Sequence, residues 1–170
     1  FIVNYLDMDT FDLIIIGGGP SGYAAAMRGI DYGKKVCLIE RDKIGGAGVY
    51  DGALSSKTLW EVANRVAGIN DAIVLEGRDP YEISWESVQK TVNEAKLERK
   101  LQYSIHLKLL QDTTTNQLLW VERGEASFVS AHEVKIVHEG NEKTIRGEHI
   151  ILATGSRPRQ LPQYEIDEPS

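Results

Sequence analysis

The chain has 170 residues, of which 42% are hydrophobic and 26% are charged, and its formal net charge is −6. This length and composition are typical of one globular domain and leave too little chain for two well-packed ones. The acidic balance, without a lysine or arginine cluster, argues against a protein that binds nucleic acid or a charged membrane surface.

The first ten residues, FIVNYLDMDT, lack the charged start and the cleavage pattern of a signal peptide, so we interpret residues 1–10 as an N-terminal extension. The longest apolar runs of the sequence are far shorter than the length that is needed to cross a bilayer. We therefore expect a cytoplasmic protein that has no membrane span.

Residues 11–40 have the pattern of a β-α-β unit. FDLIII, residues 11–16, is a continuous apolar and β-branched run, which is typical of a strand buried on both faces. An alanine-rich segment predicts a helix that ends near Gly33, and KVCLIE, residues 35–40, has the pattern of a second buried strand. Such strands are expected to be parallel, with a right-handed crossover. Cys37 is expected to be a buried core thiol. Because it is the only cysteine, a disulfide within the chain is excluded.

Two further helices are predicted in the middle of the chain. The first begins at Ser55 or Ser56, either of which would cap it, and it ends at Gly68. The second covers residues 84–111, and its apolar residues fall on two faces, which predicts a bend or a change of packing partner midway. One face holds Val88, Val92 and Ala95, and the other holds Leu97, Leu101 and Ile105.

Short strand candidates fill the later part of the chain and predict a small antiparallel β-meander inserted into an α/β domain. HIILATGS, residues 149–156, has the pattern of one more buried strand that ends in small residues. The proline-rich residues 157–170 have the composition of a linker. The four meander candidates cover residues 118–123, 125–130, 133–139 and 142–148.

GGGPSG, residues 17–22, has the glycine pattern of a phosphate-binding loop. Gly17 permits a tight turn, Gly19 lets the backbone approach a pyrophosphate, and Gly22 allows the helix and the strand to pack closely. The N-terminus of the following helix offers free N–H groups to phosphate oxygens. Glu40 ends the next strand at about the sequence separation, about 20 residues, that is expected for a carboxylate that binds a ribose. This context predicts a dinucleotide site and leaves the choice between NAD and FAD open.

Residues 10–165 together resemble the FAD domain of the pyridine nucleotide-disulfide oxidoreductases, the family of lipoamide (dihydrolipoamide) dehydrogenase, glutathione reductase and the soluble transhydrogenases. The resemblance rests on DLIIIGGGPSG, KVCLIER, KIGGAGVYDGALSSKTL and HIILATGSRPRQLP, which occur in the family's order. It implies a Rossmann-like FAD-binding domain with a parallel sheet at residues 11–156. It also implies a linker at residues 157–170 toward an absent nicotinamide-binding domain.

The same resemblance implies FAD as the cofactor and NAD(P)H as a substrate of the full-length protein. It implies a homodimer as well, whose contacts lie in segments beyond this chain. The glycine loop is placed at the pyrophosphate, Glu40 and Arg41 at the adenosine, and the segments GEASF and ATGS near the cofactor. The implied cofactor-binding residues are Gly17, Gly19, Pro20, Ser21, Gly22, Glu40, Arg41, Gly46, Ala47, Lys57, Glu125, Ala126, Ala153, Thr154 and Gly155.

The segment that resembles the family's redox loop departs from it in three ways. Gly48 and Ala53 occupy the positions of the two redox cysteines, so we expect no electron transfer to a dithiol. Ala47 lacks the family's threonine hydroxyl, and Ser55 replaces its proline. Lys57 is retained, and the family pattern places it beside the flavin, so we interpret it as a candidate catalytic residue.

Three functions are compatible with these features. The leading one is an NAD(P)H-dependent FAD oxidoreductase that passes electrons to a small non-disulfide acceptor, a quinone or a second nicotinamide. The alternatives are a non-catalytic flavin-binding or scaffold module, including a lipoamide dehydrogenase homologue that has lost activity, and a dehydrogenase that uses the loop for NAD. The four histidines lack metal-ligand spacing, so we expect no metal site. The 170-residue chain alone is expected to be inactive.

Overall fold

The computed structural model describes residues 8–112, 117–156, 159 and 161. Nearly all of the expected N-terminal extension and linker lies outside the described residues, so the predicted domain boundaries stay predictions.

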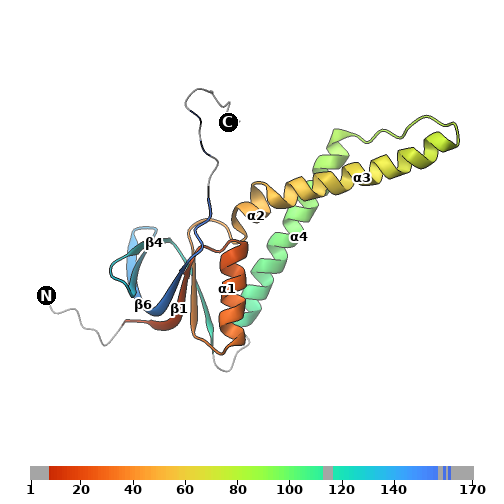
Figure 1. Cartoon of the computed structure of the whole chain (residues 1–170). Helices are drawn as coiled ribbons and strands as arrows, with labels where there is room; N and C mark the ends of the chain where they lie inside the picture. Colours follow the sequence, from red (N-terminus) through yellow and green to blue (C-terminus); the bar gives the residue numbers. More distant parts are fainter. Residues whose placement is uncertain (1–7, 113–116, 157–158, 160, 162–170) are drawn as a thin grey trace.

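The described part forms a sheet of six strands in the order β3-β2-β1-β6-β5-β4, with helices on one side (Figure 1). The strands are Thr10–Ile16 (β1), Val36–Glu40 (β2), Leu119–Arg123 (β3), Glu125–Phe128 (β4), Glu133–His138 (β5) and Asn141–Leu152 (β6). The helices are Pro20–Asp31 (α1), Gly46–Tyr50 (α2), Ala53–Leu75 (α3) and Trp85–Asp112 (α4).

The predicted β-α-β unit is confirmed. β1 and β2 pair in parallel with Ile14 opposite Cys37, and α1 forms the crossover between them. Gly29 lets α1 lie close to the sheet, because an added Cβ atom would be 2.7 Å from the side chain of Val36. The α/β fold with a parallel core and an antiparallel part is therefore present as expected.

The meander differs from the prediction in two respects. The first candidate, β3, pairs in parallel with β2 and extends the parallel part of the sheet, so only β4, β5 and β6 form the antiparallel part. The fourth candidate, residues 142–148, and the strand predicted at residues 149–156 form the single strand β6, which pairs antiparallel with β5 and parallel with β1. The end of β6 is not buried as predicted, because Ile151 and Leu152 are exposed. Gly147 leaves room for the side chain of Ile14 on the neighbouring strand β1, because a Cβ atom there would be 2.8 Å from it.

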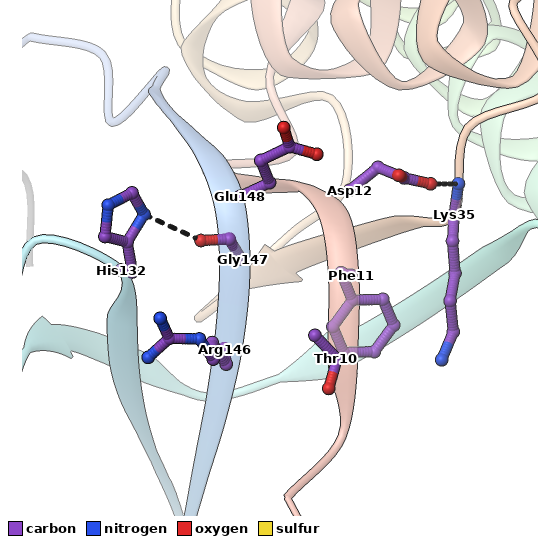
Figure 2. Close-up of a pocket in the computed structure, with 8 residues that line it drawn as sticks. All are labelled: Thr10, Phe11, Asp12, Lys35, His132, Arg146, Gly147 and Glu148. Atoms are coloured by element: carbon purple, nitrogen blue, oxygen red, sulfur yellow. Dashed lines mark hydrogen bonds between the residues drawn. The ribbon is translucent and has the colours of Figure 1, made fainter.

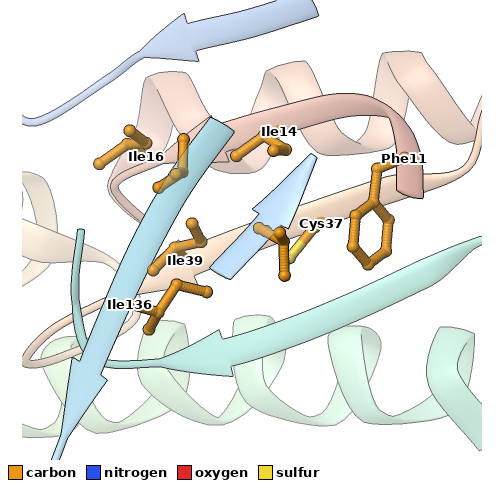
Figure 3. Close-up of a cluster of buried hydrophobic side chains, with 8 residues drawn as sticks. Phe11, Ile14, Ile16, Cys37, Ile39 and Ile136 are labelled. Atoms are coloured by element: carbon orange, nitrogen blue, oxygen red, sulfur yellow. The ribbon is translucent and has the colours of Figure 1, made fainter. Parts of the chain in front are cut away.

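The hydrophobic core lies on both faces of β1 and β2, which explains their continuous apolar sequences. One cluster, between the parallel strands and the antiparallel part, contains Ile14 and the fully buried thiol of Cys37 (Figure 3). The other cluster, toward α1 and α4, contains Ile15 and Leu107. The prediction that Cys37 is a core residue is confirmed.

Helices α3 and α4 form a long hairpin that projects from the sheet (Figure 1). Its base is attached to α1 through the stacked rings of Tyr23 and Tyr103, whose centroids are 4.2 Å apart. The predicted limits of the first helix were wrong: α3 begins after Gly52 with no described side chain capping it, and it continues through Gly68 to Leu75. A glycine inside a helix costs only about 1 kcal/mol, and the apolar face toward α4 outweighs that cost.

Helix α4 is uninterrupted over 28 residues. The two apolar faces predicted for it differ in how far they are buried. Val88 and Leu107 are buried, whereas the second apolar face, at Leu97, Leu101 and Ile105, remains about half exposed. Among the described residues, no helix is long and apolar enough to cross a membrane.

Candidate cofactor-binding site

The glycine loop lies where the carboxyl ends of β1, β2 and β6 meet. The N–H of Gly17 donates to the carbonyl oxygen of Ile39 at 2.8 Å, and the N–H of Ala153 donates to the carbonyl oxygen of Ile16 at 2.8 Å. After β1 the chain crosses to β2, which pairs with one edge of β1, while β6 pairs with the other edge. Ligands of open α/β sheets bind at such a point, outside the carboxyl ends of the strands.

The three glycines of the pattern are required for different reasons. Gly17 has φ +110°, and a Cβ atom there would be 2.3 Å from the carbonyl oxygen of Ala153. A Cβ atom at Gly22 would be 1.8 Å from the carbonyl oxygen of Gly17. At Gly19, by contrast, an added Cβ atom would find no described atom within 4 Å. The packing of the protein thus needs Gly17 and Gly22, whereas Gly19 faces open space.

The N-terminus of α1 adjoins this open space. Gly19 is the N-cap residue, no described side chain caps the helix, and Pro20 occupies its first position. The first turn, which the structure describes in full, contains no acidic residue. The N–H groups of the first turn and the positive end of the helix dipole therefore remain available to an anion.

Glu40 connects the end of β2 to the glycine loop. Its Oε2 accepts a hydrogen bond from the N–H of Gly18 at 2.7 Å, and its Oε1 accepts one from the N–H of Asp42 at 2.8 Å. An ionised carboxylate has about four acceptor positions, so two remain for the hydroxyl groups of a ribose. Arg41 is exposed beside it. The geometry gives Glu40 a structural role, which is to hold the loop, and its role toward a ribose stays a prediction.

The segment that resembles the redox loop lies directly on the glycine loop. The N–H of Gly45 donates to the carbonyl oxygen of Gly18 at 2.8 Å. A Cβ atom at Gly46, whose φ is +48°, would be 3.3 Å from Cα of Gly19. A Cβ atom at Gly48 would be 2.5 Å from Cγ of Pro20. Glycines therefore let this segment form one side of the site.

The structure brings two more predicted segments to the same place. The N–H of Gly124 donates to the carbonyl oxygen of Glu40 at 3.0 Å, which puts Glu125 and the start of β4 beside the end of β2. On the other side of the loop, Ala153 contacts Gly17, and Cα of Thr154 would be 3.2 Å from a Cβ atom there.

Other predicted residues are not brought into contact with the loop. Lys57 is exposed on α3, and no hydrogen bond or ion pair joins it to any described residue. Ala47 and Ala53 are also exposed. The Oγ atom of Ser55 is buried and has no hydrogen-bond partner among the described residues.

Sequence reasoning missed the roles of Gly18 and Gly45, which join Glu40, the glycine loop and the redox-like segment. It treated Gly48 only as a replaced cysteine and did not foresee its contact with Pro20. The available signal was the density of glycine in both loops, because glycine permits close backbone contact.

Tyr50 at the end of α2 completes this side of the site. The Nζ atom of Lys43 is 5.4 Å from the centre of the Tyr50 ring, within the range of a cation–π contact. Burial, followed by the charge of Asp42, raises the pKa of the Tyr50 phenol. The phenol of Tyr50 therefore keeps its proton at physiological pH.

A separate cavity of about 370 Å³ lies at the amino end of β1 (Figure 2). His132 Nδ1 is 3.1 Å from the carbonyl oxygen of Gly147, and the guanidinium of Arg146 is 3.2 Å from Glu133. The charged side chains around it have both signs, so they do not select a ligand of either charge. Its lining residues are Thr10, Phe11, Asp12, Lys35, His132, Arg146, Gly147 and Glu148.

Comparison with known proteins agrees with this arrangement. The family model of the pyridine nucleotide-disulphide oxidoreductases matches residues 11–168. The chain is 32% identical over 158 residues to a dihydrolipoyl dehydrogenase from Chlorobaculum parvum, an alignment that covers 92% of this chain and 32% of the relative. It is 31% identical over 168 residues to a soluble pyridine nucleotide transhydrogenase from Mycobacterium tuberculosis, covering 95% of this chain and 34% of the relative.

Solved structures show the same fold. The HOCl-induced flavoprotein disulfide reductase RclA from Escherichia coli has a TM-score of 0.67 at 23% identity, over 89% of this chain and 29% of that chain. At this identity the likeness concerns the fold alone. The chain spans about a third of the length of the curated relatives it matches.

Proposed function

Because the chain belongs to the pyridine nucleotide-disulphide oxidoreductase family, we propose that it is the FAD-binding part of a longer NAD(P)H-dependent flavoprotein oxidoreductase. The observation that carries this proposal is the open space at Gly19, beside an uncapped helix N-terminus and the carboxylate of Glu40. A pyrophosphate needs N–H donors, and an adenosine ribose needs an acceptor. The site supplies both.

Each segment of the site would hold one part of FAD. The backbone of Gly19 and the first turn of α1, with Pro20 and Ser21, would bind the pyrophosphate. Glu40 would accept hydrogen bonds from the ribose hydroxyls, while the start of β4, at Glu125 and Ala126, would lie along the adenine.

The remaining predicted residues would lie along the rest of the cofactor. Gly46 and Ala47 on one side, with Ala153, Thr154 and Gly155 on the other, would border it beyond the pyrophosphate. Arg41 and Lys57 stay predictions from the family pattern, because no contact in the structure tests either of them.

When bound, FAD would supply the redox chemistry between a nicotinamide donor and an acceptor. The protein would contribute binding, orientation and the choice of acceptor. Gly48 and Ala53, which match the redox cysteines of the family, carry no sulfur to accept electrons. We therefore assign the longer protein a non-disulfide acceptor, a quinone or a second nicotinamide.

Calorimetric titration of the chain with FAD, ADP, FMN and NAD tests the binding part of the proposal. FAD and ADP share the adenosine diphosphate group that the proposed site would bind, so both should bind. FMN should not bind, because it lacks the adenosine. Binding of FMN without ADP would overturn the assignment of this site.

The acceptor is tested on the longer protein, loaded with FAD and supplied with NADH or NADPH. Lipoamide, glutathione disulfide, a quinone and a nicotinamide analogue should be assayed side by side. Turnover of a disulfide would contradict the proposed acceptor class, and turnover of none of the four would favour the non-catalytic flavin-binding module.

A further inference from the structure

Tyr103 on α4 contacts two segments of the site that are distant from each other in the sequence. Its ring stacks on the ring of Tyr23 in α1, with the centroids 4.2 Å apart and the planes inclined by 11°. The same ring lies against Gly45, in the segment that resembles the redox loop. A Cβ atom added to Gly45 would be 3.7 Å from Cδ2 of Tyr103, which is an ordinary van der Waals distance.

Both contacts lead to the glycine loop. The N–H of Tyr23 donates to the carbonyl oxygen of Gly19 at 2.9 Å, within the first turn of α1. The N–H of Gly45 donates to the carbonyl oxygen of Gly18 at 2.8 Å. Tyr103 is therefore one residue removed from two adjacent positions of the loop, and one of them, Gly19, faces the open space of the site.

Neighbouring side chains support these contacts. The hydroxyl group of Tyr23 is hydrogen-bonded to Nδ1 of His106, one turn beyond Tyr103, so α4 holds Tyr23 by its ring and by its hydroxyl group. Val49, which is only 2% exposed, packs on the same side of Gly45 as Tyr103, because a Cβ atom there would be 2.7 Å from Cγ2 of Val49. The ring of Tyr103 thus belongs to a packed cluster behind the loop.

We propose that Tyr103 is a positioning residue of the cofactor site, which holds the start of α1 and the segment around Gly45 in place on either side of the pyrophosphate. This role presupposes the dinucleotide site of the proposed function. A loop that is already held in its binding conformation loses less conformational entropy when the ligand binds, so its affinity is higher.

The aromatic ring of Tyr103, and not its hydroxyl group, carries this role. Stacked aromatic rings stabilise a contact beyond the area that they bury. No hydrogen bond joins the Tyr103 hydroxyl group to another residue in the described part of the chain. Phenylalanine should therefore replace Tyr103 without loss, whereas alanine should not.

Hydrogen exchange of the 170-residue chain, followed by NMR without any ligand, tests whether Tyr103 holds the segment. In Tyr103→Ala the N–H of Gly45, which bonds to Gly18, should exchange at least about threefold faster, whereas the amides of β1 keep their rates. Tyr103→Phe should behave like the native chain. The matched control is Val88→Ala, which removes part of a buried side chain about 22 Å away along α4 and should leave the exchange of Gly45 unchanged.

Calorimetric titration of the same variants tests the consequence for binding. The dissociation constants of FAD and ADP should both rise about tenfold in Tyr103→Ala, because both ligands carry the pyrophosphate. They should change less than about twofold in Tyr103→Phe and in Val88→Ala.

Faster exchange in β1 and at Gly45 alike would show that Tyr103 contributes to stability alone, and it would overturn the proposal. If the native chain binds FAD and Tyr103→Ala binds it equally well, the proposal is wrong as well. A native chain that binds neither FAD nor ADP would instead refute the proposed function. The exchange rate of Gly45 would still decide whether Tyr103 holds the segment, since that measurement needs no ligand.

Discussion

Gly48 lies against Pro20 so closely that a Cβ atom added to it would be 2.5 Å from Cγ of the proline ring. Helix α2 therefore rests on the first residue of α1 at a separation that only glycine permits. The resemblance to the family implies a redox cysteine at the matching position. In this chain a cysteine side chain there would have to displace α2 or the proline ring.

Gly48→Cys should consequently destabilise the protein, by about 1–3 kcal/mol, because an overpacked side chain must displace either α2 or the proline. Urea unfolding followed by circular dichroism measures the change. Ala53→Cys is the matched control, since Ala53 is exposed and should change the stability by less than about 0.5 kcal/mol. Equal stability of the two variants would show that α2 can move away without cost.

The glycine loop allows folding and binding to be separated with two variants. Gly22→Ala should strongly destabilise the fold, because its Cβ atom would be 1.8 Å from the carbonyl oxygen of Gly17. The Cβ atom of Gly19→Ala would meet no described atom within 4 Å, and the φ of Gly19 is −71°. This variant should therefore fold normally and lose affinity for FAD. Thermal unfolding and FAD titration of both variants provide the measurement. Normal FAD affinity in a folded Gly19→Ala chain would argue against a pyrophosphate at this loop.

Glu40→Ala should affect stability as well as binding. It leaves the N–H of Gly18, a partly buried group, without its acceptor, at a cost of about 1–3 kcal/mol. FAD affinity should fall further, because the ribose acceptor is lost. Glu86→Ala, on the exposed surface of α4, controls for the loss of one negative charge. If both variants unfold at the same urea concentration, Glu40 does not hold the loop.

Cys37 predicts how stability changes in alkaline solution. Burial, followed by the charge of Glu122, raises the pKa of its thiol to about 12. The folded protein thus keeps this proton where the unfolded chain, with a thiol pKa of about 8.5, has released it. The stabilisation is complete below pH 8.5 and is lost as the pH rises toward 12, by at most about 1.4 kcal/mol per pH unit.

Comparing urea unfolding at pH 8 and pH 10 for the native chain and Cys37→Ala isolates this contribution. Tyrosines and lysines titrate equally in both proteins, so the native chain should lose about 1–2 kcal/mol more than the variant between the two conditions. Equal losses would mean that the Cys37 thiolate is tolerated in the core.

Local signals were sufficient for residues 10–40. The apolar run of β1, the glycine loop and the acid at the end of β2 each depend on neighbours in sequence, and the structure joins Glu40 to the glycine loop through the N–H of Gly18. The later strands were less predictable, because the direction in which β3 pairs depends on β2, about eighty residues earlier. Helix α3 passes Gly68 for a similar reason, since packing on α4 outweighs a local signal to stop.

The site shows the same division between local and distant information. That Gly48 contacts Pro20 depends on how two loops fold onto each other, and no pattern of residues encodes that distance directly. Lys57 illustrates the opposite case. Its place in a motif suggested a role beside the flavin, and no contact of the structure tests that role.

Strand β6 pairs with β1 along one edge and with β5 along the other, so the last described strand lies beside the first. Closing the β1–β6 ladder requires a loop of more than a hundred residues, which makes it a slow step in folding. On the ribosome, β1 therefore waits with one edge unpaired until Asn141–Leu152 has emerged. During that interval the apolar run Leu13–Ile16 is open to pairing with another nascent chain, so slower elongation or a stop before β6 would favour aggregation.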